Sequence, residues 1–151
     1  MRVLLSALAL VHVLLAAASG PISWTFASEP AADGKVLVRL MAVCEEGWHI
    51  YALTLPRDDG PLPTVIRNTG VGTYKLDGAI AEPAAEEVDD PNFGMKVRYH
   101  AGTTTFTLPI ERLTDDAFEV TGEVEFMSCN DKTCLPPRTV KFTVPVPARA
   151  K

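Results

Sequence analysis

The chain has 151 residues, with 14 basic and 19 acidic side chains and a formal net charge of −5. This length suits a single globular domain with its own hydrophobic core. The acidic balance, with no basic stripe in the sequence, disfavours nucleic acid as a partner.

The first 18 residues predict a secretory signal peptide. Arg2 precedes a charge-free apolar run from Val3 to Ala18, and that run ends in three alanines. One positive residue, an apolar segment and small residues at its end are typical of a cleaved leader. A transmembrane anchor is the alternative, but the run is short for a membrane span. We therefore expect removal of residues 1–18, a single domain over 19–151, and a periplasmic or secreted protein.

Short alternating segments predict an all-β domain. Polar and apolar residues alternate in runs rich in β-branched and aromatic side chains, and turn residues separate the runs. We expect strands at 22–26, 35–44, 48–51, 64–67, 73–76, 95–99, 103–110, 118–126 and 139–144. Residues 55–63 and 82–92 are expected to be loops, and strands 95–99 and 103–110 to form a hairpin. Many short strands and 12 prolines predict an antiparallel β-sandwich.

Two of the three cysteines, Cys129 and Cys134, lie between the last two expected strands. Asn130-Asp131 supplies turn-forming residues, and Pro136-Pro137 prevents a helix from following. We expect a hairpin that carries both thiols at its tip, where a turn can bring them within disulfide distance. The third cysteine, Cys44, ends an apolar run and is expected to be a buried free thiol.

The spacing of this pair leaves its role open. A disulfide across so short a loop stabilises the chain by only about 2 kcal/mol in the loop-entropy estimate, which mildly favours redox chemistry. A structural clip remains an alternative, because the spacing is not the C-x-x-C of redox motifs. A metal site is the third possibility, since Cys129, Cys134, His49 and His100 could form a Cys₂His₂ zinc site.

Three segments resemble a known family, the amino-terminal periplasmic domain of the thiol:disulfide interchange protein DsbD. They are Gly47-Trp48-His49-Ile50-Tyr51, Gly60-Pro61-Leu62-Pro63-Thr64 and the cysteine segment from Cys129 to Pro137. The resemblance covers nearly the whole chain after the leader. It implies an immunoglobulin-like β-sandwich, in agreement with the alternating pattern. That family domain is usually fused to a membrane domain and a thioredoxin domain, so a stand-alone copy would take electrons from a separate donor.

The resemblance also implies roles for individual residues. Cys134 would be the exposed thiol that forms mixed disulfides, and Cys129 would resolve them. In the family a loop phenylalanine covers the disulfide, and Phe93 is the candidate for this cap.

Four further residues are implied near the site. Asp89 and Asp90 precede Phe93 in the candidate cap loop, where negative charge would disfavour a thiolate. His49 and Tyr51, from the Gly47–Tyr51 segment, are also expected close to the cysteines.

The expected function is thiol-disulfide exchange in the cell envelope, a protein-disulfide reductase activity. By the resemblance, a thioredoxin-like donor would supply electrons, and disulfide isomerases or cytochrome c maturation factors would receive them. No cofactor is expected for this electron transfer. The alternative is a protein-binding or assembly module whose Cys129–Cys134 disulfide is only structural.

Overall fold

A computed structural model describes residues 14–15 and 20–149 of the chain. These residues form twelve β-strands, a single 3₁₀ turn at Ala32–Gly34, and no α-helix. None of their segments is a helix long and apolar enough to span a membrane. The strands are β1 (Leu14–Leu15), β2 (Ile22–Pro30), β3 (Lys35–Cys44), β4 (His49–Tyr51), β5 (Val65–Asn68), β6 (Tyr74–Leu76), β7 (Glu86–Asp90), β8 (Met95–Ala101), β9 (Thr103–Arg112), β10 (Phe118–Phe126), β11 (Ser128–Cys129) and β12 (Arg138–Val146).

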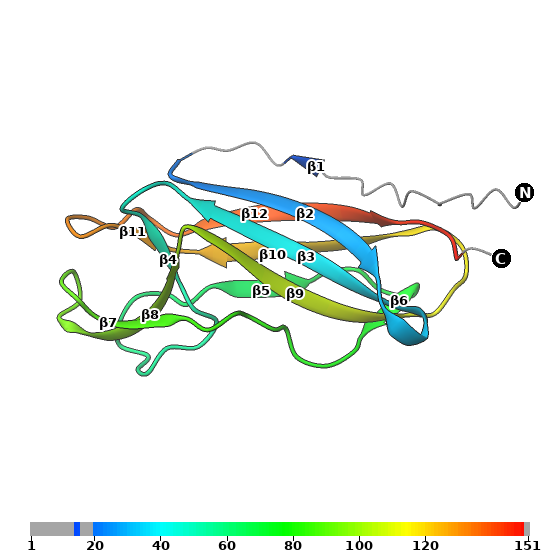
Figure 1. Cartoon of the computed structure of the whole chain (residues 1–151), viewed down its shortest axis with the longest axis horizontal. Coiled ribbons are helices and arrows are strands. Elements are labelled where there is room, and N and C mark those ends of the chain that lie inside the picture. Colours follow the sequence, from blue (N-terminus) through cyan, green and yellow to red (C-terminus); the bar gives the residue numbers. More distant parts are fainter. Residues whose placement is uncertain (1–13, 16–19, 150–151) are drawn as a thin grey trace, which may run out of the picture.

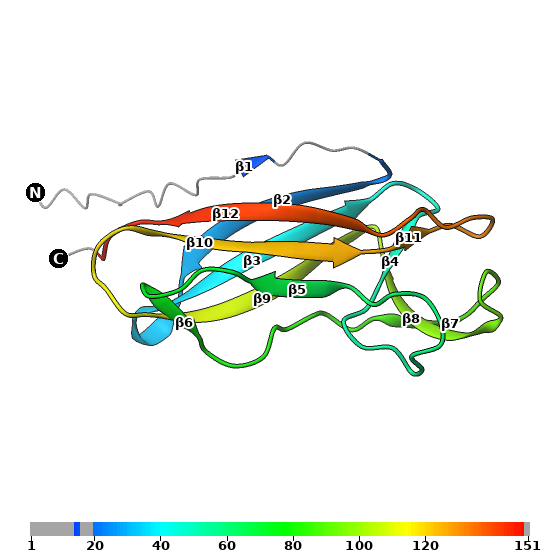
Figure 2. The same ribbon diagram turned by 180° about the vertical axis from the view of Figure 1, so that it is seen from behind.

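Two antiparallel sheets face each other to form a sandwich (Figures 1 and 2). A five-stranded sheet has the order β1-β2-β3-β9-β6, and a three-stranded sheet has the order β12-β10-β5. Apart from Leu14–Leu15, the predicted signal peptide lies outside the described residues. β2 pairs with β3 along its whole length, from Ile22 opposite Cys44 to Pro30 opposite Val36.

Alternate residues of the long strands fill the core between these sheets. The burial of β3 and β10 alternates residue by residue, as the polar and apolar pattern of their sequences predicts. Aromatic rings cross from sheet to sheet: the centroids of Trp24 and Phe126 are 5.5 Å apart, and those of Phe26 and Phe142 are 5.1 Å apart. This burial provides most of the stability of such a fold.

A third, four-stranded sheet lies at one end of the sandwich, with the order β11-β4-β8-β7 (Figure 1). Its strands continue the sandwich strands along the chain, because β4 follows β3, β9 follows β8, and β11 follows β10. The two faces of this sheet differ: Ile50 belongs to the main core, whereas Tyr51 and Cys129 belong to a second apolar cluster. The sandwich therefore fixes the position of a small separate layer that contains the cysteines.

One expected loop contains a strand. Within residues 82–92, Glu86–Asp90 pairs with β8 from Glu86 opposite Tyr99 to Asp90 opposite Met95. The loop prediction is wrong here because acidic residues are depleted in strands and this segment does not alternate polar and apolar residues. β7 is an edge strand, so Glu86, Glu87 and Asp89 can face water, whereas Asp90 is buried.

The expected hairpin between 95–99 and 103–110 is also incorrect. β8 pairs with β4 and β7, whereas β9 pairs with β3 and β6, so the chain changes sheet between them. Gly102 makes the turn with a φ of 64°, a left-handed conformation that glycine adopts without strain. The turn chemistry was recognisable from the sequence, but the partner of each strand was not.

Cys44 provides a test of the core. It is a free thiol with 7% exposure, and its Sγ lies 3.7 Å from the carbonyl oxygen of His100. Burial raises its pKa from 9.0 to about 11, because the apolar surroundings disfavour a thiolate. At pH 8 this shift alone leaves about a hundredfold less thiolate than in the unfolded chain.

We predict that iodoacetamide leaves Cys44 unmodified in the native protein at pH 8 and modifies it fully in urea, as measured by mass spectrometry. Because folding raises this pKa, the contribution of Cys44 to stability is complete below pH 9 and declines as pH rises towards about 11. The urea midpoint of Cys44→Ala should therefore lack the part of the pH dependence between pH 9 and 11 that the Cys44 thiol contributes. Rapid modification of the native protein would contradict the buried position.

Candidate functional site

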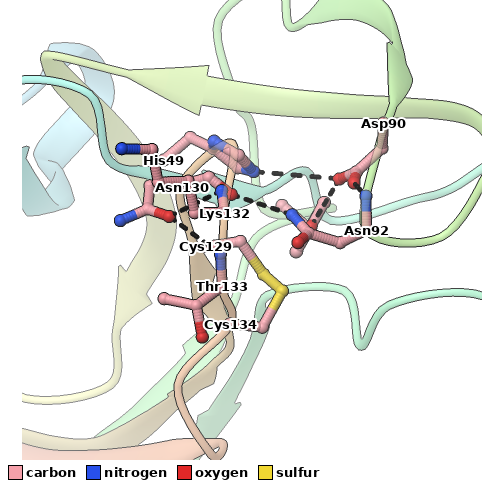
Figure 3. Close-up of a disulfide and its surroundings, with 9 residues drawn as sticks. His49, Asp90, Asn92, Cys129, Asn130, Lys132, Thr133 and Cys134 are labelled. Atoms are coloured by element: carbon pink, nitrogen blue, oxygen red, sulfur yellow. Dashed lines mark hydrogen bonds and ion pairs between the residues drawn. A yellow bond between two sulfur atoms is a disulfide. The ribbon is translucent and has the colours of Figure 1, made fainter.

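The two cysteines lie at the tip of a long hairpin. β10 and β12 pair from Phe118 opposite Val146 to Phe126 opposite Arg138, and the chain between them extends beyond the sandwich. Cys129 and Cys134 are joined in a disulfide with their Cα atoms 4.0 Å apart (Figure 3). The predicted hairpin with both cysteines in its loop is confirmed.

Asn130 organises the loop that the disulfide closes. Its side-chain Oδ1 accepts hydrogen bonds from the backbone N–H groups of Lys132 and Thr133, both at 2.9 Å. Its own N–H donates to the carbonyl of Thr133 at 2.9 Å. Asparagine is common in turns because its side-chain oxygen can accept hydrogen bonds from backbone N–H groups two or three residues further along the chain in this way. The loop is therefore held by local hydrogen bonds in addition to its covalent bond.

The two cysteines differ in accessibility. Cys129 lies in β11, pairs with His49 of β4 and is fully buried. Cys134 follows the turn and is only partly buried. Thiol-disulfide exchange begins with attack of a thiolate on a sulfur it can reach, so Cys134 is the more accessible target.

Aromatic side chains on the same face as Cys129 surround the disulfide. Residues directly opposite each other in a sheet share a face, so Cys129 shares a face with His49 and Tyr51 shares a face with Tyr99. His49 and Tyr51 are two residues apart in β4, so all four side chains lie on one face. The His49 ring stacks on Tyr99 with centroids 4.4 Å apart and meets Tyr51 edge-on at 5.3 Å. Burial lowers the pKa of His49, although the charges of Asp90 and Asp131 act in the opposite direction. Burial therefore favours the neutral imidazole.

Asp90 is a buried carboxylate at the end of β7, with 2% exposure. Its Oδ2 accepts a hydrogen bond from the Tyr51 hydroxyl at 2.7 Å, and its Oδ1 accepts one from the backbone N–H of Asn92 at 2.8 Å. Burial, followed by the hydrogen bond to Asp90, raises the pKa of Tyr51. His49 Nε2 lies 3.9 Å from Asp90 Oδ2, which is too far for a hydrogen bond; the dashed line between them in Figure 3 marks a contact that becomes an ion pair only when the imidazole is protonated.

Phe93 lies in the turn between β7 and β8. It packs against the apolar cluster that includes Tyr51, Cys129 and Cys134, and its ring meets Tyr51 edge-on at 6.2 Å. The next residue, Gly94, has a φ of 62° and donates its N–H to the Asp90 carbonyl at 2.8 Å. This tight turn directs the half-buried Phe93 side chain to the same cluster as the disulfide.

The remaining predicted residue, Asp89, has a different environment. Because side chains alternate along a strand, Asp89 projects from the opposite face of β7 to Asp90. Its side chain is 83% exposed, and its Oδ2 lies 3.6 Å from Lys96 Nζ. The structure brings Cys129, Cys134, His49, Tyr51, Asp90 and Phe93 together and leaves Asp89 at the surface.

Sequence reasoning missed several residues of this cluster. Asn92 donates from Nδ2 to the carbonyl oxygen of Asn130 at 2.8 Å and so joins the Phe93 turn to the cysteine loop. Tyr99 and Met127 also pack against the second apolar cluster. The alternation of β8 could have placed Tyr99 on this face once its pairing with β4 was known. Nothing in the sequence marks the contact of Asn92.

The zinc alternative does not match this geometry. His100 lies opposite Ile50 in the sheet and shares its face. His49 is the neighbour of Ile50 along β4, so its side chain projects from the other face. His100 Nε2 instead lies 3.0 Å from Glu82 Oε2, and both candidate sulfur ligands are in the disulfide. Across the residues that the structure describes, no three His, Cys, Asp or Glu side chains cluster as metal ligands would.

Solved structures similar to this chain include two periplasmic domains. The N-terminal periplasmic domain of ScsB from Proteus mirabilis aligns with 90% of this chain at 14% identity and a TM-score of 0.62, and the chain spans 52% of that domain. The reduced N-terminal domain of DsbD from Neisseria meningitidis aligns with 83% of this chain and 86% of its own length, at 17% identity and a TM-score of 0.55. These likenesses confirm the predicted immunoglobulin-like antiparallel β-sandwich.

Comparison with curated proteins gives no match. Residues 22–145, nearly the whole domain, match the family described as thiol:disulfide interchange protein DsbD, N-terminal. The chain therefore belongs to the family of DsbD amino-terminal domains, and its cysteine pair lies in a thiol:disulfide interchange domain.

Proposed function

We propose that this domain carries reducing equivalents from a thioredoxin-like donor to disulfide-bonded proteins of the cell envelope. The observation that supports it best is the asymmetry of the pair, with Cys129 fully buried and Cys134 partly exposed beside it. An exchange site requires one sulfur that a partner can reach and a second that remains within the domain to resolve the mixed disulfide.

The domain is loaded in two displacements. A donor thiolate attacks Cys134 Sγ, the Cys129–Cys134 bond breaks, and its electron pair leaves with Cys129 Sγ, which then takes up a proton. The second thiolate of the donor attacks the donor sulfur of the mixed disulfide and expels Cys134 as a thiolate. The donor leaves as a disulfide, and the domain holds the two electrons as a dithiol.

Delivery reverses these roles. The Cys134 thiolate attacks a disulfide of the acceptor and releases one acceptor sulfur as a thiolate. Cys129 then loses its proton and attacks Cys134 Sγ, which expels the second acceptor sulfur and restores the Cys129–Cys134 bond. Disulfide isomerases and cytochrome c maturation factors are the acceptors proposed by family likeness.

The surroundings of the pair limit its reaction with the wrong thiol. The buried carboxyl group of Asp90 would make a negative sulfur less favourable, which lowers the fraction of thiolate in the reduced pair. Phe93, half-buried against the cluster of both cysteines, acts as a cap that restricts the approach of small thiols. Contact with a cognate partner would displace this cap.

Export through the 1–18 leader completes this proposal, since an oxidising compartment supplies the disulfide-bonded acceptors. We predict that the exported protein begins at or near Ser19, because residues 16–18 are three small residues that suit cleavage. Amino-terminal sequencing measures this directly. Exported material that retains Met1 would contradict it.

The proposed roles of the two cysteines predict unequal reactivity. Cys129→Ala should form a mixed disulfide with oxidised glutathione at least about ten times faster than Cys134→Ala, because rate depends on access to the sulfur. Mass spectrometry of quenched samples follows the adduct, and a second adduct in urea identifies Cys44.

Cys129→Ala should also retain envelope proteins from an extract as mixed disulfides that dithiothreitol releases. Cys134→Ala is the matched control, with the same number of thiols. If both variants react equally slowly and retain nothing, the disulfide is a structural clip and the exchange proposal fails.

The cap predicts that Phe93→Ala speeds reduction of the disulfide by dithiothreitol while the urea midpoint hardly changes. If Phe93 instead supports the fold, its removal should cost about 3–5 kcal/mol, as emptying a buried aromatic site usually does. Both quantities are measured on the same variant. A large loss of stability without faster native reduction would assign Phe93 to the core.

A further inference from the structure

We propose that Asn92 is the latch that holds the cap over the disulfide, through its hydrogen bond to the carbonyl oxygen of Asn130. The inference rests on the proposed role of Phe93 as a cap and adds the residue that positions it. Here the latch means this one hydrogen bond, from Asn92 Nδ2 to Asn130 O at 2.8 Å (Figure 3).

The latch is the contact that crosses between the two loops. Within the cap turn, the N–H of Asn92 donates to the Asp90 side chain, and the N–H of Gly94 donates to the Asp90 carbonyl. These bonds shape the turn but do not connect it to the cysteines. Among the described residues, the hydrogen bond that joins the cap turn (residues 91–94) to the cysteine loop (residues 128–135) is the one from Asn92 to Asn130.

Asn92 also occupies the position from which a latch controls the cap. It directly precedes Phe93, so fixing its side chain restricts the backbone from which the phenylalanine projects. Its exposed position means that the bond competes with water and contributes little to overall stability. Because the acceptor is a peptide carbonyl, the group facing it must be the Nδ2 donor of the amide.

The other end of the latch depends on the disulfide. The accepting carbonyl belongs to the residue after Cys129, inside the loop that the Cys129–Cys134 bond closes. The same residue forms the turn through Oδ1 and its own N–H, so the carbonyl direction is set by the loop conformation. The carbonyl that the latch uses is therefore presented by a loop that the disulfide closes.

Four variants test the latch: Asn92→Ala, Asn92→Asp, Phe93→Ala and the double variant Asn92→Ala/Phe93→Ala. Asn92→Asp keeps the size and shape of the side chain but replaces the Nδ2 donor with an oxygen, so a carboxylate would face the carbonyl oxygen of Asn130. Pro91→Ala is the matched control, because it relaxes the neighbouring exposed position and leaves the hydrogen bond in place. The measured rate is reduction of the native disulfide by dithiothreitol at fixed pH, alongside the urea midpoint.

We expect both Asn92 variants to be reduced about three to ten times faster than the parent protein, the range given by loss of one exposed hydrogen bond. The urea midpoints should stay nearly unchanged, and Pro91→Ala should remain close to the parent. The double variant should match Phe93→Ala, because a latch has no effect without the cap that it holds.

The outcomes separate the latch from the cap. If Phe93→Ala is reduced faster but Asn92→Ala is not, the cap stands and the latch fails. Additive effects in the double variant, or equal acceleration by Pro91→Ala, also overturn the latch. If neither Phe93→Ala nor Asn92→Ala changes the rate, the proposed cap fails and the latch fails with it.

Discussion

Alternating burial along the long strands is the constraint on which the rest of the molecule depends. In β3 and β10 every second side chain is buried, so a shift of one residue would expose the whole apolar face of the strand. The register of β10 against β12 is thereby fixed, and Phe126 lies opposite Arg138. The cysteine loop leaves the sandwich at a defined point, although none of its own residues belongs to the main core.

A buried carboxylate then organises the small sheet at that end. An unpaired charge inside a protein is costly, so Asp90 must be supplied with hydrogen bonds. The Tyr51 hydroxyl and the Asn92 N–H supply them, one from β4 and one from the turn. The same requirement therefore bends the tip of the β7–β8 hairpin towards the cysteine loop and brings Phe93 to the cluster. The carboxyl group that we propose disfavours a thiolate therefore also shapes the turn that contains Phe93.

The sequence allowed the sandwich and the cysteine hairpin to be predicted, because both follow from local alternation and turn chemistry. β7 escaped prediction because its pairing with β8, and not the propensity of Glu and Asp, makes it a strand. Whether Asp89 or Asp90 faces the cysteines depends on that pairing, since neighbours in a strand point to opposite faces. The bond of Asn92 to Asn130 joins two loops 38 residues apart, and only the assembled fold brings them together.

The energetics of the disulfide are compatible with repeated opening and closing. Closing so short a loop contributes only about 2 kcal/mol, whereas the β10–β12 ladder and the aromatic contacts between sheets do not involve the cysteines. Reduction should therefore loosen the loop and leave the sandwich folded. A bond between distant strands would have made the folded state depend on oxidation. Placing the pair within one hairpin tip keeps the stability of the sandwich largely independent of the disulfide, as the proposed exchange reaction requires.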